Sequence, residues 1–137
     1  MKRILIVEDD ETFVYFCKVI LERSQNSYEV LTAYDGVEAL EVIDRQESTI
    51  DLILLDVNMP RMNGHQFLAK YNERNPSSIP IVVMLTSSDQ DRDREQSNQY
   101  SFVKDYLVKP LTEEHIKRFE SLYETAASNE SSQARKP

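Results

Sequence analysis

The chain has 137 residues, the length of one domain, and its 24 acidic residues outnumber its 16 basic residues to give a net charge of -8. This excess of acid argues against direct binding to the phosphate backbone of nucleic acids. The sequence contains two glycines and one cysteine, which excludes a glycine-rich phosphate loop, a disulfide framework and a cysteine-based zinc site.

Short apolar runs and helical patterns alternate along the first half of the chain. Residues 4–7 (ILIV) are fully apolar, as in a strand buried on both faces, and residues 28–33 alternate in part, as in a strand nearer a sheet edge. Between them, apolar residues recur at the spacing of one helix face: Phe13, Cys17, Ile20 and Leu21. Asp35 can cap a second helix. The apolar face of that helix consists of Val37, Leu40 and Ile43.

The alternation continues in the second half. Three further runs predict strands, at residues 50–55, 79–85 and 102–108. A turn at Asn63-Gly64 precedes a third helix that ends near Asn75-Pro76, and Thr112 can cap the last helix. The predicted inward side chains are Phe67, Leu68 and Tyr71 in the third helix and Ile116, Phe119 and Tyr123 in the last.

This order of elements predicts the architecture. Strands that alternate with helices form parallel sheets through right-handed crossovers, with helices on both faces. We therefore predict an α/β fold with a doubly wound, five-stranded parallel sheet and five helices, over residues 1–127. Residues 128–137 (SNESSQARKP) carry no large apolar side chain, which indicates a disordered tail or the start of a linker.

The apolar runs also bear on localisation. None approaches the roughly 18 to 20 residues that a membrane span needs. Only four apolar residues follow Met1-Lys2-Arg3, so we expect no signal peptide. With a single cysteine, the chain is expected to be a reduced, soluble, cytoplasmic protein.

Polar residues follow the predicted strands at the point where each strand ends. They are Glu8, Asp9 and Asp10 after the first strand, Asp56 after the third, Thr86 and Ser87 after the fourth, and Lys109 and Pro110 after the fifth. Parallel strands end at one edge, where such sheets bind ligands, so these side chains are expected to share a crevice. Crowded carboxylates require a cation, and oxygen ligands suit Mg²⁺. A screened Asp56 carboxylate could then attack phosphorus, with Thr86 and Lys109 holding the phosphoryl oxygens. The pattern predicts phosphoryl acceptance.

Four segments carry a joint pattern: ILIVEDD at 4–10, LILLDVNMPRMNG at 52–64, VVMLTSS at 82–88 and DYLVKPL at 105–111. In order and spacing they resemble the receiver domain of two-component response regulators, from residue 4 to about residue 125. The resemblance implies the flavodoxin-like, chemotaxis-regulator-like strand order 2-1-3-4-5. It also implies that a sensor histidine kinase or a phosphotransfer protein donates the phosphoryl group.

The resemblance implies a role for each acidic residue. Asp56 matches the phosphorylated aspartate, and Glu8 and Asp9 match the acidic pair that holds Mg²⁺, with Asp9 as a direct ligand and Glu8 acting through water. Asn58 matches the residue whose backbone carbonyl completes the metal ligands. Asp10 is expected to open the first helix, where its charge suits the helix dipole.

The resemblance also implies how phosphorylation is reported. Thr86 matches the hydroxyl that follows the phosphoryl group, Tyr106 the aromatic side chain that swings inward with it, and Lys109 the lysine that pairs with phosphate. Pro110 resembles the cis proline of the family. The reporting surface would be the fourth helix, fifth strand and last helix, where a downstream protein or a second copy binds.

Two segments depart from the family pattern. The small residues usual before the fifth strand are replaced by Tyr100-Ser101-Phe102-Val103, and the segment 89–99 (DQDRDREQSNQ) contains no aliphatic residue. A helix without an apolar face gains little from packing, so we expect a short, solvated, marginally stable fourth helix. We hypothesise that phosphorylation shifts its local order.

Alternatives from other functional classes stay open at this point. One is a degenerate receiver that binds partners without being phosphorylated. Another is a phosphatase of the haloacid dehalogenase type, although that class needs a second acid where this chain has Asn58. The downstream partner is unknown, and a monomer or weak homodimer is expected.

Three further reactive side chains are interpreted as structural. Cys17 lies on the apolar face of the first helix and is expected to be inert. His65 and His115 have no second ligand at metal spacing, so neither receives a functional role.

Overall fold

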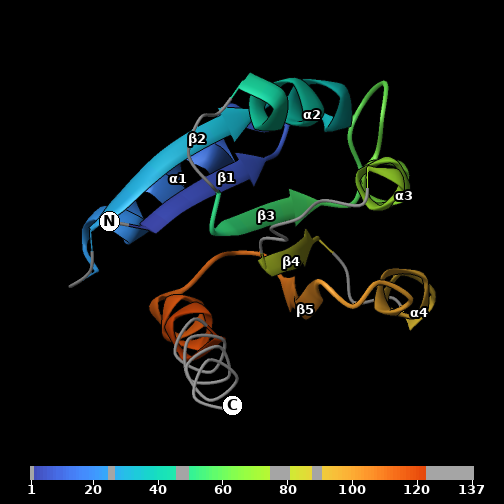
Figure 1. The fold of residues 1–137 in the computed structure, drawn as a ribbon. Coiled ribbons are helices and arrows are strands. Elements are labelled where there is room, and N and C mark those ends of the chain that lie inside the picture. Colours follow the sequence, from blue (N-terminus) through green and yellow to red (C-terminus); the bar gives the residue numbers. More distant parts are fainter. Residues whose placement is uncertain (1, 25–26, 46–49, 75–80, 88–90, 123–137) are drawn as a thin grey trace, which may run out of the picture.

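The computed structural model describes residues 2–24, 27–45, 50–74, 81–87 and 91–122, and it contains the predicted alternation of strands and helices (Figure 1). The strands are β1 (Lys2–Val7), β2 (Tyr28–Ala33), β3 (Leu52–Asp56), β4 (Ile81–Thr86) and β5 (Val103–Val108). The helices are α1 (Glu11–Glu22), α2 (Gly36–Arg45), α3 (Gly64–Glu73) and α4 (Asp91–Asn98), followed by a C-terminal helix over residues 113–122. All strand pairs are parallel, in the order β2-β1-β3-β4-β5, which confirms the predicted fold.

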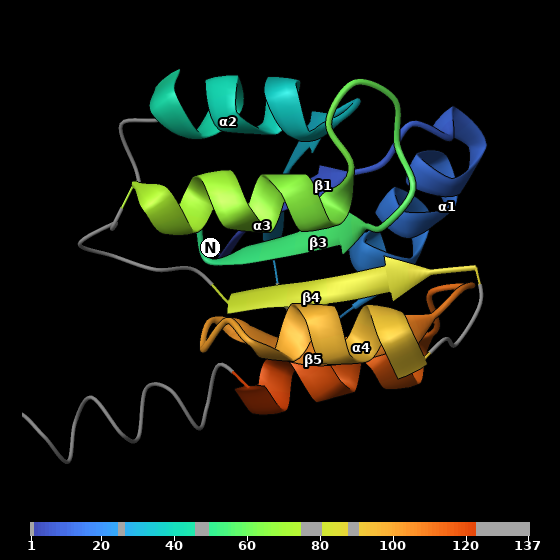
Figure 2. The same ribbon diagram turned by 90° about the vertical axis from the view of Figure 1, so that its right-hand side faces the viewer.

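Two apolar cores cover the two faces of the sheet. Successive strand residues point to opposite faces, so Leu5 and Val7 join one core and Ile4 and Ile6 the other. Helices α2 and α3 pack on the first face, and α1 and the C-terminal helix pack on the second. In Figure 2 the viewer faces the side of α3 and α4, with α4 in front of β5. Both faces of the central strands are therefore buried.

Polar caps fix where the helices begin. The carboxylate of Asp10 accepts hydrogen bonds from the backbone N–H groups of Thr12 and Phe13, so Asp10 caps α1 as predicted. Asp35 accepts one from the N–H of Glu38 at 3.0 Å and caps α2. A further capping hydrogen bond joins Thr112 to the N–H of His115 at the start of the C-terminal helix, and Asn63 caps α3 in a capping box with Gln66.

Several element boundaries differ from the prediction. β1 begins at Lys2 because its backbone pairs with β2 from Tyr28 onward. β3 begins at Leu52 and not at residue 50, although Ile50 is buried beside it. The predicted inward Tyr123, the strand start at 79–80 and the tail 128–137 lie outside the described residues.

Helix α4 forms without an apolar face. Among residues 94–98, whose side chains are described, Ser97 is the buried one. The helix contacts α3 and β5. Its order in solution and the effect of phosphorylation on it stay predictions.

No helix in the described part of the chain is long and apolar enough to cross a membrane.

Candidate functional site

Three carboxylates gather at the carboxyl edge of the sheet. Glu8 and Asp9 follow β1, and Asp56 is the last residue of β3. One carboxylate oxygen from each lies within 4.8 Å of the other two. Glu8 and Asp56 are buried, at 5% and 6% exposure, and Asp9 is half-buried. The structure thus brings together three of the four acidic side chains that were predicted to share a crevice; the fourth, Asp10, lies outside the cluster.

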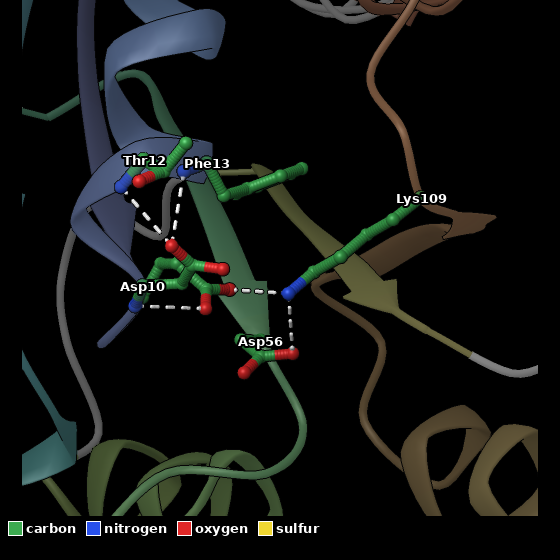
Figure 3. A network of polar contacts seen from close by, with 6 residues as sticks. Asp10, Thr12, Phe13, Asp56 and Lys109 are labelled. Atoms are coloured by element: carbon green, nitrogen blue, oxygen red, sulfur yellow. Dashed lines mark hydrogen bonds and ion pairs between the residues drawn. The ribbon is translucent and has the colours of Figure 1, made fainter.

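Lys109 supplies positive charge to this group. Its ammonium nitrogen lies 2.6 Å from Oε2 of Glu8 and 3.4 Å from Oδ1 of Asp56. Figure 3 shows the lysine reaching toward Asp56 from the segment after β5, beside Phe13 of α1. The same nitrogen lies 4.4 Å from the centre of the Phe13 ring, so the ammonium group faces an aromatic surface as well as two carboxylates.

Burial governs the electrostatics of the site. Desolvation raises the pKa of Glu8 to about 7, and the neighbouring Asp56 charge adds to the shift while Lys109 opposes it. Desolvation likewise raises the pKa of Asp56, against the pull of Lys109. For Lys109, burial alone would lower the pKa, but the hydrogen bond to Glu8 and the charge of Asp56 raise it above its ordinary value. One lysine therefore does not fully compensate two buried carboxylates.

The donor atoms of this site suit a hard divalent cation. Three carboxylates provide oxygen ligands that lie close to one another, and burial raises the pKa of two of them, Glu8 and Asp56, which favours a site that a bound cation would neutralise. Asn58 lies two residues after Asp56 in the β3–α3 loop, with an exposed side chain. The residues that are present fit Mg²⁺.

Close packing beneath Asp56 depends on Gly64. Its N–H donates to the carbonyl oxygen of Val57 at 2.9 Å. A Cβ atom on Gly64 would lie 2.5 Å from the carbonyl oxygen of Asp56, which is closer than side-chain carbons approach backbone. Glycine is therefore required for the loop to fold back against the end of β3.

Thr86 and Tyr106 lie on β4 and β5. Thr86 is buried at the end of β4, and its carbonyl oxygen accepts a hydrogen bond from the N–H of Lys109 at 2.7 Å. The hydroxyl oxygen of Tyr106 is shielded from solvent, and its ring packs against the core on the α2 and α3 face. The guanidinium carbon of Arg94, on α4, lies 5.2 Å from the centre of that ring. The peptide bond between Lys109 and Pro110 is cis, as the resemblance implied.

Three other reactive side chains have structural surroundings. Cys17 is fully buried, and burial raises the pKa of its thiol to about 12, which leaves it unreactive. Nδ1 of His115 accepts a hydrogen bond from the N–H of Thr112 at 3.2 Å, within the cap of the last helix. Asp10 is occupied as the cap of α1 and is not part of the carboxylate cluster.

Two features of the site could not be recognised in the sequence. The helical spacing placed Phe13 on the buried face of α1 but carried no signal that its ring lies against Lys109. The pairing of Arg61, in the loop after Asp56, with Asp35 joins residues 26 positions apart and follows no motif.

Comparison with known proteins identifies the family. The family model of the response regulator receiver domain matches residues 4–119. The chain belongs to this family. Protein PilH of Pseudomonas aeruginosa is 34% identical over 116 residues, which cover 85% of this chain and 92% of PilH. The transcriptional regulatory protein CpxR of Escherichia coli K12 is also 34% identical over 116 residues, but these cover 46% of its length.

Solved structures agree with this assignment. The CheY-like receiver domain protein of Methanospirillum hungatei has 28% sequence identity and a TM-score of 0.76, over 96% of this chain and 98% of that one. The Mn²⁺-bound form of the response regulator Rcp1 has 27% identity and a TM-score of 0.73, over 89% and 91%. Phosphoryl acceptance is the function of this family, so the degenerate-module and phosphatase alternatives are not favoured.

Proposed function

We propose that this chain is a phosphorylation-controlled switch in which Asp56 accepts a phosphoryl group from a sensor histidine kinase or a phosphotransfer protein. The observation that carries the proposal is the position of Asp56, buried at the end of β3 close to two other acidic side chains and 3.4 Å from the ammonium group of Lys109. The receiver occupies residues 1–127, with 128–137 as a tail or linker, in the cytoplasm. The only catalysis is its own phosphorylation and dephosphorylation.

Glu8, Asp9 and Asp56, with the backbone carbonyl of Asn58, would hold the metal ion. Asp9 would be a direct ligand, and Glu8 would act through water. When bound, Mg²⁺ neutralises the charge that accumulates on the phosphoryl oxygens during in-line transfer. The fit of the three carboxylates supports this assignment, and so does the related response regulator Rcp1, whose solved structure is a Mn²⁺-bound form.

The side chains of this chain carry the transfer. A carboxylate oxygen of Asp56 forms a bond to phosphorus while the bond between phosphorus and the donor breaks, and the electron pair leaves with the donor. Lys109 then pairs with a phosphoryl oxygen, for which its present partner Glu8 competes. The hydroxyl of Thr86, at the end of the adjacent strand β4, donates a hydrogen bond to another oxygen.

The phosphorylated state is reported through Tyr106. Its ring already lies between the core and Arg94 of α4, so an inward movement that follows Thr86 would alter the contact with α4. The reporting surface comprises α4, β5 and the C-terminal helix. A downstream protein, an output domain or a second copy binds there. The chain does not contact nucleic acid or membrane directly. The free chain is a monomer or weak homodimer.

Phosphorylation by a small-molecule donor tests the proposal. Incubation with acetyl phosphate and Mg²⁺ should add the mass of one phosphoryl group, and Asp56→Asn should abolish the addition. Asp44→Asn, an exposed aspartate at the far end of α2, is the matched control and should be modified like the wild type. If the wild type gains no mass in the presence of Mg²⁺, or if Asp56→Asn gains as much as the wild type, the proposal is wrong.

A further inference from the structure

A buried carboxylate outside the acidic site pairs with the loop that follows Asp56. Asp35 is fully buried, at 0% exposure, and Arg61 reaches it with two nitrogens. Nε lies 2.6 Å from Oδ2, and a terminal nitrogen lies 3.1 Å from Oδ1. The same Oδ1 caps α2 by accepting from the N–H of Glu38. Both oxygens of this carboxylate are therefore used.

The backbone of Arg61 adopts a conformation that arginine seldom takes. Its φ angle is 59°, in the left-handed region, where residues other than glycine are uncommon. Such conformations persist where surrounding contacts fix them. The forked contact with Asp35 is such a contact, since it holds the guanidinium group in one plane and one orientation.

The pair forms part of a set of anchors along the β3–α3 loop. On one side of Asn58, the carbonyl oxygen of Val57 accepts from the N–H of Gly64. On the other side, Arg61 binds Asp35, and the carbonyl oxygen of Met62 accepts from the N–H of Gly36 at 3.0 Å. Figure 2 shows this loop rising from the end of β3 toward the start of α2 and then returning to α3. Asn58 and the two residues after it thus span the distance between two fixed points.

We propose that Asp35 and Arg61 are positioning residues for the metal site, and that their ion pair fixes the β3–α3 loop so that the Asn58 carbonyl can complete the ligand set. This inference rests on the proposed function, because that function assigns the carbonyl to the metal. Neither residue touches the metal or the phosphoryl group. Their effect passes through the backbone from Arg61 to Asn58.

The chemistry of the pair determines which substitutions are informative. Asparagine tolerates the left-handed conformation, so Arg61→Asn removes the guanidinium group without imposing a new backbone penalty. Asp35→Asn retains an oxygen that can cap α2 but loses the charge that pairs with Arg61. Arg61→Lys retains the charge but not the two parallel hydrogen bonds.

The experiment measures the Mg²⁺ dissociation constant of each variant, together with the Mg²⁺ dependence of phosphorylation by acetyl phosphate. Loss of residues that orient ligands typically weakens metal binding 10- to 100-fold. We expect Arg61→Asn and Asp35→Asn each to raise the constant about tenfold, and Arg61→Lys to raise it less. The double variant should stay near tenfold and not reach the product of the two effects, because both substitutions break the same interaction.

A merely structural role would give a different pattern. It would lower the melting temperature but leave the Mg²⁺ constant unchanged when measured well below that temperature. At saturating Mg²⁺, the variants should regain the phosphorylation rate of the wild type, because the side chains at Asp56 are intact. Arg74→Ala is the matched control. It breaks an ion pair with Asp44 at the C-terminal ends of α2 and α3, and it should change neither the Mg²⁺ dissociation constant nor the Mg²⁺ dependence of phosphorylation.

The outcomes separate this inference from the proposed function. If the wild type shows no Mg²⁺-dependent phosphorylation, the proposed function fails. If the wild type is phosphorylated but Arg61→Asn binds Mg²⁺ within twofold of it, the function stands and the positioning role of the pair is wrong. If the effects of Arg61→Asn and Asp35→Asn on the Mg²⁺ dissociation constant multiply in the double variant, the two residues act independently, and the inference that they act as a pair is also wrong.

Discussion

Lys109 contacts Glu8 more closely than it contacts Asp56, at 2.6 Å against 3.4 Å. In the unphosphorylated protein the lysine therefore serves first as the counter-ion of Glu8. Phosphorylation of Asp56 places new anionic oxygens beside the same ammonium group, and the lysine must divide its hydrogen bonds between them and Glu8. Glu8 thus competes with the phosphoryl group for Lys109.

Removal of Lys109 should weaken the unphosphorylated fold. In Lys109→Ala, two buried carboxylates lose their shared counter-ion, so we expect a loss of about 2 kcal/mol in the free energy of unfolding at pH 8. The loss should shrink at pH 6, where Glu8 takes up a proton. Urea denaturation without metal measures both values. Lys104→Ala, an exposed lysine on β5, is the control. In Lys109→Ala, phosphorylation of Asp56 should persist in part, but the signal to downstream partners should be lost.

The pH dependence of stability has a defined sign. Burial raises the pKa of Glu8 to about 7, above the value of about 4.3 for an exposed glutamate. Between these values the folded state binds a proton that the unfolded state does not, so the stability of the metal-free protein falls as the pH rises. The slope reaches at most about 1.4 kcal/mol per pH unit for one proton.

Thermal unfolding in EDTA between pH 5 and pH 8 measures this effect. Glu8→Gln should flatten the fall in melting temperature, and Glu11→Gln, an exposed carboxylate on α1, should not. A melting temperature that rises steadily over this range in the wild type would show that other groups outweigh Glu8.

Metal affinity should have the opposite pH dependence. Glu8 must be deprotonated to hold the metal, even through water, so Mg²⁺ binding releases the proton that Glu8 holds below pH 7. We expect the Mg²⁺ dissociation constant to rise up to about tenfold for each pH unit below 7, since one proton is released. Calorimetry in buffers of different ionisation enthalpy counts that proton directly. An affinity independent of pH between 6 and 8 would contradict the proton affinity inferred for Glu8.

Asp10 should act on helix stability and not on metal binding. Asp10→Ala removes the acceptor for the N–H groups of Thr12 and Phe13 and should cost about 1 kcal/mol of folding free energy. Asp10→Asn keeps a capping oxygen and should cost little. Neither variant should change the Mg²⁺ dissociation constant by more than about twofold, because Asp10 is outside the carboxylate cluster. A large change in Asp10→Asn would place this residue among the ligands.

Helix α4 should exchange its amide hydrogens faster than α3. The described side chains of α4 bury only Ser97, whereas α3 buries Phe67, Leu68 and Tyr71. Local opening therefore exposes little apolar surface in α4 and costs less free energy. Hydrogen exchange of the unphosphorylated protein, read by peptide, tests this difference. Slow amides throughout residues 91–98 would rule out the hypothesis that phosphorylation shifts the order of this helix.

The periodicity of the sequence predicted the fold because the central strands and their helices bury long apolar patterns. Ile4 and Leu5, for example, face different cores, and an uninterrupted apolar run is what burial on both faces requires. Strand ends were less predictable. β1 extends back to Lys2 through backbone pairing with Tyr28, which depends on the neighbouring strand and not on the side chain of Lys2.

The site was predictable where chemistry follows directly from strand ends, as for Asp56 and Lys109. It was not predictable where geometry depends on loops. Asp35 was expected to cap α2, and it does, but its second role with Arg61 requires two loops to meet in space. The left-handed backbone of Arg61 carried no sequence signal either, because arginine is not typical of that conformation.

The Phe13 ring makes this site accessible to optical measurement. The chain contains no tryptophan, and this ring lies 4.4 Å from the ammonium group whose partners are expected to change on phosphorylation. Phe13→Trp would put a single indole beside the charge that moves. Its emission would then follow the rearrangement of Lys109 in real time, without a label and without a downstream partner.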